Sequence, residues 1–159
     1  MKSAINPDEL AGILARTRRT HFFIGIDPGK HTAIAVWDSH EDKFISIDTK
    51  LLHQAMEIVK EYNTKYPGDV FVIYEDARQR KWYGNNERKV KAKIKGAGSI
   101  ERDSTIWEDF LTDLKIPFRA VPPRAGMTKV DERYFRAISK WDKRTSEHAR
   151  DAAMLVLGK

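Results

Sequence analysis

The sequence feature that most constrains the fold is a continuous apolar run, Val70 to Tyr74, that follows a predicted helix. Before that helix come three strand-like segments with short polar connections: Phe22 to Asp27, Thr32 to Trp37 and Lys43 to Ile47. Connections this short predict an antiparallel meander. A strand that follows a crossover helix normally lies parallel in the same sheet, with a right-handed connection. The order of elements therefore predicts a mixed α/β sheet whose fourth strand is Val70 to Glu75.

The remaining periodic segments complete this pattern. The crossover helix ends at Pro67-Gly68 and has one apolar face, made of Leu51, Leu52, Ala55, Ile58, Val59 and Tyr62. A second helix is predicted by the helical spacing of Ile106, Trp107, Phe110, Leu111 and Leu114. Three more elements are predicted after it: a strand over Phe118 to Val121, and helices over Glu132 to Trp141 and Ser146 to Leu157. We therefore expect a five-stranded mixed sheet, with three antiparallel and then two parallel strands, flanked by helices.

The chain has 159 residues, the usual size of one domain. Residues 1–20 are predicted to be an N-terminal amphipathic and basic extension, because Leu10, Ile13 and Leu14 have helical spacing and arginines follow them. Residues 21–159 are predicted to form the domain. There is no cysteine, which excludes disulfides, zinc–thiolate sites and cysteine nucleophiles.

The charge of the chain points to polyanionic partners. Its formal net charge is +6, and a basic face gains free energy when it displaces counterions from phosphates. No apolar run approaches the roughly 20 residues of a membrane span, and the N-terminus has no signal-peptide pattern. We therefore expect a cytoplasmic protein that binds nucleic acid and no membrane.

Two acidic residues end predicted strands. Asp27 ends the first strand, before the sharp turn Pro28-Gly29, and Glu75 ends the fourth, with Asp76 directly after it. If these strands are parallel neighbours, both carboxylates emerge at the carboxyl ends of the sheet, where open α/β sheets form their ligand crevice. Divalent cations such as Mg²⁺ or Mn²⁺ would neutralise such a pair. The alternative for Asp27 is that its carboxylate only caps the turn.

The last predicted helix contributes a second polar pair. His148 and Asp151 are three residues apart and therefore share a helical face. Ala149, Ala152 and Ala153 let this helix approach the sheet closely. The pair is thus predicted to point inward, and the alternative is an exposed histidine beside an ordinary surface aspartate.

The order of these motifs, Gly25-Ile26-Asp27-Pro28-Gly29, then Glu75, then His148-x-x-Asp151-Ala152, resembles the RuvC family of Holliday junction resolvases from about Phe22 to the C-terminus. The resemblance implies a ribonuclease H-like fold and a nuclease that cuts Holliday junctions and other branched DNA in recombination and repair. It also implies that Asp27, Glu75 and Asp151 bind metal.

By the same resemblance, two Mg²⁺ or Mn²⁺ ions per active site would promote hydrolysis of a phosphodiester. His148 would bind the second metal or handle a proton of the nucleophile. The implied assembly is a homodimer, since symmetric cutting needs two sites, and no small-molecule cofactor is expected. The leading segment and the long basic stretch fit a phage-type or prophage-type resolvase.

A strongly basic stretch follows the predicted catalytic glutamate. Between Arg78 and Lys95 a single acid, Glu87, accompanies Arg78, Arg80, Lys81, Arg88, Lys89, Lys91, Lys93 and Lys95. We predict a flexible loop that follows phosphates beside the metal site; a solvated loop without specific contacts is the alternative. Trp82 and Tyr83 are predicted to stack on bases or to wedge into a junction, or else to anchor the loop in the core.

Two further basic residues follow the fifth strand. Arg124 is a predicted DNA contact, and Lys129 is the candidate for stabilising charge in the transition state. An ordinary surface lysine is the alternative for Lys129.

Three other functions fit parts of the pattern. A ribonuclease H acting on an RNA–DNA hybrid would need an inward glutamate on the crossover helix, but Glu57 and Glu61 fall off its apolar face. An actin-like ATPase or sugar kinase would need two such lobes. A non-catalytic module that binds branched DNA would not need acids that repel phosphates.

Overall fold

The computed structural model describes residues 20–80, 87–124 and 129–159, and for residues 87–97 the backbone alone. The predicted extension, apart from its last residue, lies outside the described residues. In chain order the elements are β1 (Phe22–Asp27), β2 (His31–Asp38), β3 (Lys43–Leu51), α2 (Leu52–Lys65), β4 (Val70–Glu75), the short 3₁₀ helix η1 (Ala77–Gln79), α3 (Glu87–Asp113), β5 (Phe118–Val121), α4 (Glu132–Ser139) and α5 (Glu147–Met154).

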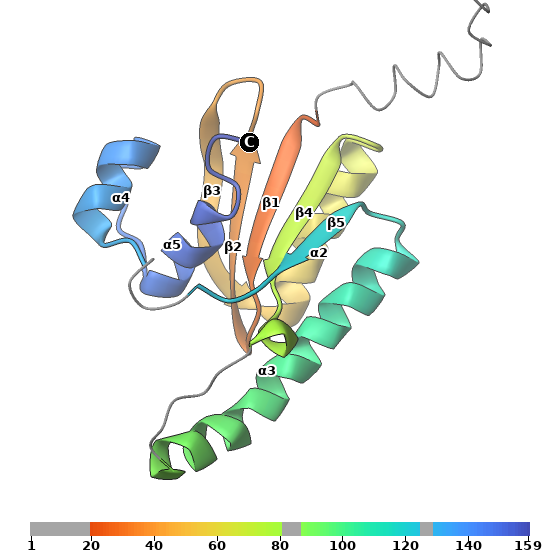
Figure 1. Ribbon diagram of the computed structural model, residues 1–159. Coiled ribbons are helices and arrows are strands. Elements are labelled where there is room, and N and C mark those ends of the chain that lie inside the picture. The colour runs from red at the N-terminus through yellow and green to blue at the C-terminus, as the bar shows by residue number, and fades with distance from the viewer. Residues whose placement is uncertain (1–19, 81–86, 125–128) are drawn as a thin grey trace, which may run out of the picture.

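The five strands form one mixed sheet in the order β3-β2-β1-β4-β5. Strand β2 runs antiparallel to both β1 and β3, while β4 runs parallel to both β1 and β5 (Figure 1). The prediction of a five-stranded mixed α/β sheet, with three antiparallel and two parallel strands flanked by helices, is therefore confirmed. None of the described helices is long and apolar enough to cross a membrane.

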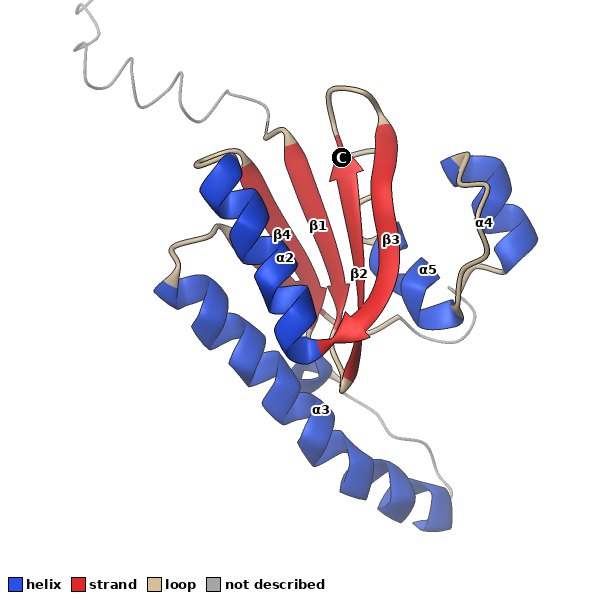
Figure 2. Cartoon of the chain, turned by 180° about the vertical axis from the view of Figure 1, so that it is seen from behind, coloured by secondary structure: helices blue, strands red, loops and turns tan. Residues whose placement is uncertain are grey.

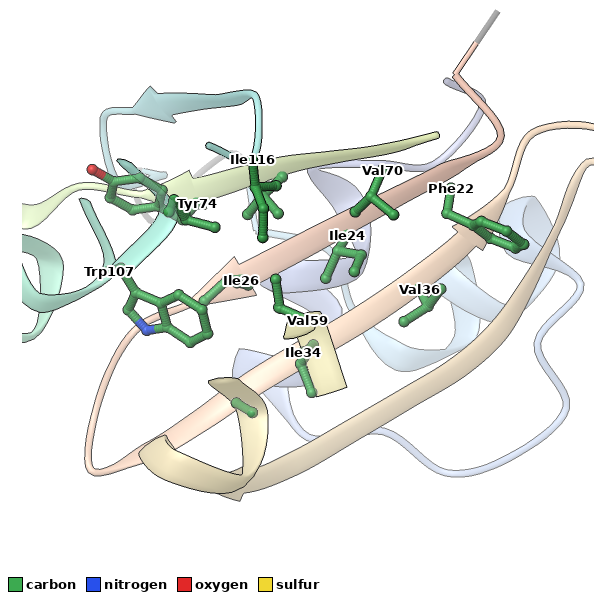
Figure 3. Packing of buried hydrophobic residues seen from close by; sticks show 13 residues of the cluster. Phe22, Ile24, Ile26, Ile34, Val36, Val59, Val70, Tyr74, Trp107 and Ile116 are labelled. Carbon is green, nitrogen blue, oxygen red and sulfur yellow. The ribbon is translucent and has the colours of Figure 1, made fainter. Parts of the chain in front are cut away.

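The helices cover the sheet from both sides. Helices α2 and α3 lie on one face, and α4 and α5 lie on the other (Figures 1 and 2). Side chains alternate along each strand, so Ile24 and Ile26 of β1 pack with Val59 of α2 and Trp107 of α3 (Figure 3). On the opposite face a second cluster joins the sheet to α4 and α5, and includes Ala33, Ala35, Ile73, Phe135, Ala152 and Val156.

The structure corrects two expectations about local structure. Helix α3 begins at Glu87, so the prediction of a loop from Arg78 to Lys95 is wrong from Glu87 onward. Lysine, arginine and alanine are good helix formers, and the basic segment continues directly into the helix that packs through Trp107. Strand β3 extends beyond Ile47 to Leu51, which is exposed and does not belong to the inward face of α2.

Candidate metal centre

The ends of β1 and β4 bring two carboxylates together. The parallel register pairs Ile26 with Tyr74, so the next residues, Asp27 and Glu75, emerge side by side at the carboxyl ends of these strands. The side chain of Asp27 is 15% exposed, and Glu75 is 8% exposed. Both acids are thus held by the sheet in a partly desolvated position.

Helix α5 lies unusually close to β1. Its start is capped by Ser146, whose hydroxyl accepts a hydrogen bond from the backbone N–H of Ala149. A β-carbon added at Gly25 would lie 2.1 Å from the carbonyl oxygen of Ala152, so only glycine leaves room for the helix. With Ala149, Ala152 and Ala153 also buried, α5 is seated on the sheet beside the strand that carries Asp27.

Replacing Gly25 with alanine is therefore expected to destabilise the protein. The new methyl group would meet backbone, which cannot rotate away, and overpacking of this kind costs about 1–3 kcal/mol. The same shift would move α5 and its polar residues relative to Asp27. Urea denaturation measures the loss of stability. The control is Gly98→Ala in α3, where nothing lies within 4 Å of the added β-carbon; a similar loss there would contradict the explanation.

Because α5 packs closely on β1, His148 and Asp151 lie beside the ends of the strands. Nδ1 of His148 lies 2.7 Å from Oδ2 of Asp27. Among the described residues, Asp27, His148 and Asp151 form a group whose potential ligand atoms all lie within 4.8 Å of one another. The His148 side chain is 71% exposed and Asp151 is buried, so the group reaches from the protein interior to the solvent.

All five residues predicted to form the catalytic site line one cavity of about 190 Å³. They are Asp27, Glu75, Lys129, His148 and Asp151. Lys129 donates a hydrogen bond to Oδ2 of Asp151 over 3.0 Å and also pairs with Glu147. The five residues predicted from the sequence thus lie close together in the structure, while the role of each residue stays a prediction.

The acids of this cavity repel one another. Burial, followed by the charges of Asp27 and Asp151, raises the pKa of Glu75 to about 7. Burial also raises the pKa of Asp27, against the opposing effect of its hydrogen bond with His148. Oε1 of Glu75 is buried without a hydrogen-bond partner among the described residues. This group of acids is electrostatically unfavourable by itself.

The donor set fits a divalent cation. Carboxylate oxygens are the preferred ligands of Mg²⁺ and Mn²⁺, and Mn²⁺ also accepts imidazole. A cation bound by Asp27, Glu75 and Asp151 would neutralise the repulsion and give the buried Glu75 oxygen a partner. His148, on the exposed side of the cavity, is the remaining candidate ligand.

Asp76, next to Glu75, has a different role. Burial would raise its pKa, but hydrogen bonds from Arg78 lower the pKa of Asp76 below its usual value. The Arg78 guanidinium donates to both oxygens of Asp76, over 2.8 and 2.9 Å, and pairs with Glu108 of α3 at 2.5 Å. Arg78 therefore ties the segment after β4 to α3, and its predicted contact with DNA stays a prediction.

The other predicted DNA contacts fall into three groups. Arg80 and Arg124 line the cavity. Lys81, Trp82 and Tyr83 lie outside the described residues. The remaining five belong to the first part of α3, whose backbone extends past the carboxyl ends of the strands (Figure 1): Arg88, Lys89, Lys91, Lys93 and Lys95.

Sequence reasoning missed the partner of Lys129. Glu147 is an exposed residue in the first turn of α5, and the sequence holds no signal that links it to a lysine 18 positions earlier.

Comparisons with known proteins do not assign a family. No protein-family model matches the chain, and no curated protein matches it. Among solved structures, the crystal structure of the yeast mitochondrial Holliday junction resolvase Ydc2 is similar, with 14% sequence identity and a TM-score of 0.39, over 99% of this chain and 85% of that chain. A likeness this distant carries no argument about function, which therefore rests on the site.

Proposed function

We propose that this protein is a metal-dependent endonuclease that cleaves branched DNA, including Holliday junctions, by hydrolysing a phosphodiester. The observation that supports this most directly is the convergence of Asp27, Glu75 and Asp151 in one cavity with His148 and Lys129. Burial and the charges of Asp27 and Asp151 raise the pKa of Glu75, and one of its oxygens has no partner among the described residues, which is unfavourable unless a cation is bound.

The proposed chemistry assigns a role to each part of the cavity. Divalent cations bound by the carboxylates would supply a nucleophile from water at neutral pH and stabilise the leaving 3′ oxygen. Lys129, whose ammonium group lies 3.0 Å from Asp151, would offset negative charge on the phosphate. His148 is exposed and hydrogen-bonded to Asp27, so its imidazole is oriented to bind a cation or to hold a proton of the nucleophile.

DNA as the substrate is supported by charge and shape. The chain has a net charge of +6, and α3 carries its basic segment beyond the sheet at the edge where the acids lie (Figure 1). No residue of α2 is among the described residues that line the cavity, and Glu57 and Glu61 are exposed, which argues against a ribonuclease H. We also propose that the active form is a homodimer and that Mg²⁺ or Mn²⁺ is the metal.

A panel of substrates tests the proposal. A four-way junction, a flap, an RNA–DNA hybrid and a linear duplex are incubated with Mg²⁺, with Mn²⁺ or with EDTA. We expect metal-dependent cleavage of the junction and the flap. Preferential cleavage of the hybrid would favour a ribonuclease H. Binding of the junction without cleavage in any divalent metal would favour a non-catalytic module.

The basic part of α3 is expected to determine the salt dependence of binding. Changing Lys89, Lys91 and Lys93 to glutamine should reduce the slope of log affinity against log salt by about 0.9 for each phosphate that the helix no longer neutralises. Fluorescence anisotropy between 50 and 200 mM salt measures this slope. An unchanged slope would mean that these lysines do not contact phosphates.

A further inference from the structure

A second cavity, of about 370 Å³, lies next to the candidate metal centre. It is bounded by the β1–β2 turn, the start of α2 and the middle of α3, and we call it the α2–α3 groove. Among its lining residues are Lys30, Leu51, His53, Ser99, Arg102 and Asp103. Pro28 and Ile100 line the metal centre, so the same turn and the same part of α3 separate the two cavities.

The described residues that line the α2–α3 groove include more cations than acids. Lys30 and Arg102 contribute two positive charges to its lining. The one acid that lines the groove, Asp103, is only 6% exposed. His53 and Ser99 add hydrogen-bonding groups. A cavity lined by two cations and a nearly buried acid suits an anion.

The lining also indicates which anion fits. The two cations come from different elements, Lys30 from the β1–β2 turn and Arg102 from α3, along a cavity of about 370 Å³. Leu51, at 38% exposure, adds an apolar surface beside them. Alternating phosphates and sugars of a nucleic-acid backbone match this combination of cations and apolar surface.

We propose that the α2–α3 groove binds the backbone of a second arm of branched DNA, while the first arm lies at the metal centre. This inference rests on the proposed function and adds how a branch is recognised. Ile100 of α3 lines the metal centre, while Ser99 and Arg102 of the same helix line the groove. Helix α3 begins at Glu87 and extends past the ends of the strands (Figures 1 and 2).

The length of this extension explains why a second arm fits better than the cleaved one. Thirteen residues of α-helix extend roughly 20 Å. A straight duplex seated at the metal centre would have to cross the wall that the β1–β2 turn and α3 form between the two cavities. A second arm that diverges at a branch would enter the groove without crossing this wall.

The test compares two double variants with the same change of charge. Lys30→Gln with Arg102→Gln neutralises the α2–α3 groove. Lys65→Gln with Lys115→Gln is the control, because Lys65 ends α2 and Lys115 follows α3, at the opposite end of the sheet. Affinities for a four-way junction and for a linear duplex of equal length are measured in EDTA, where no cleavage occurs.

Neutralising the groove should weaken junction binding by about 10-fold and reduce its salt slope by about 2, as expected when two phosphates are no longer neutralised. Binding of the linear duplex should change less than about 2-fold, so the preference for the junction falls. The control should leave that preference unchanged. A groove variant that keeps the wild-type preference, or loses affinity equally for both substrates, would overturn the second-arm proposal.

Cleavage assays with Mg²⁺ or Mn²⁺, run beside these binding measurements, separate this proposal from the proposed function. If the wild-type protein shows no preference for the junction and does not cleave it with Mg²⁺ or Mn²⁺, the proposed function fails, and the groove proposal fails with it. If the wild-type protein prefers and cleaves junctions but the groove variant does so equally well, only the second-arm proposal fails.

Discussion

Replacing Asp27 with asparagine is expected to abolish DNA cleavage while junction binding stays intact or becomes tighter. Asparagine keeps the size of the side chain but removes a charge from a group that is hydrogen-bonded to His148 and close to Asp151. Loss of a metal ligand should lower the cleavage rate by more than about 100-fold, the upper range for loss of an outer partner of a metal site. Binding should not suffer, because one negative charge facing the phosphates is removed.

Single-turnover cleavage of a labelled junction, with binding measured in parallel, checks this result. Asp109→Asn is the matched control, since Asp109 is an exposed residue of α3; that variant should cleave like the wild type. Comparable turnover in the Asp27 variant would refute its assignment as a ligand. Equal loss of binding and cleavage would instead mean that the substitution disrupts the fold.

Replacing Glu75 with glutamine is expected to stabilise the metal-free protein at alkaline pH while it destroys cleavage. The pKa of Glu75 is raised to about 7, first by burial and then by Asp27 and Asp151. Below the usual pKa of 4.5 the carboxyl group is protonated in the folded and unfolded states, so folding is not penalised. Between pH 4.5 and about 7 the unfolded chain releases this proton while the folded protein keeps it, so stability should fall by about 3 kcal/mol over this range and then level off.

Urea denaturation in EDTA between pH 4.5 and 8.5 measures this effect as the difference in unfolding free energy between the variant and the wild type. The difference should grow with pH for Glu75→Gln and stay constant for Glu61→Gln, an exposed position on α2. Mg²⁺ at about 100 times its dissociation constant should stabilise the wild type by about 2.7 kcal/mol, and the variant by less. A difference in stability that stays constant across this pH range would mean that the pKa of Glu75 is not raised in the folded protein.

Much of the fold follows from local sequence patterns. The bounds of β1, β4 and β5 match the predictions because apolar runs end at a carboxylate, a proline or a glycine in each case. The pairing of β1 with β4 follows from the rule for crossover connections. The start of α3 could not be predicted in this way, because a dense run of lysine and arginine indicates repulsion and hence a loop, whereas the described backbone is helical from Glu87.

For the candidate site, the sequence indicates which residues belong to it better than it indicates which of them contact one another. Acids at strand ends and an alanine-rich helix each also fit an ordinary capping or surface role, and it is their order, which resembles the RuvC family, that led to Asp27, Glu75 and Asp151. The pairing of Lys129 with Glu147 and of Arg78 with Glu108 depends on how separate elements dock. The α2–α3 groove likewise joins three distant segments, and no periodicity or spacing connects Lys30 with Arg102.

The separation of the site residues along the chain has a consequence for protein synthesis. His148 and Asp27 touch across 121 positions of sequence. During translation, residues that carry β1 to β4 leave the ribosome long before α5, so a nascent chain holds Asp27 and Glu75 without Asp151 or His148. If the protein is the proposed nuclease, its site is incomplete until α5 has emerged and docked on β1 beside Gly25, and unfinished chains would not cut DNA.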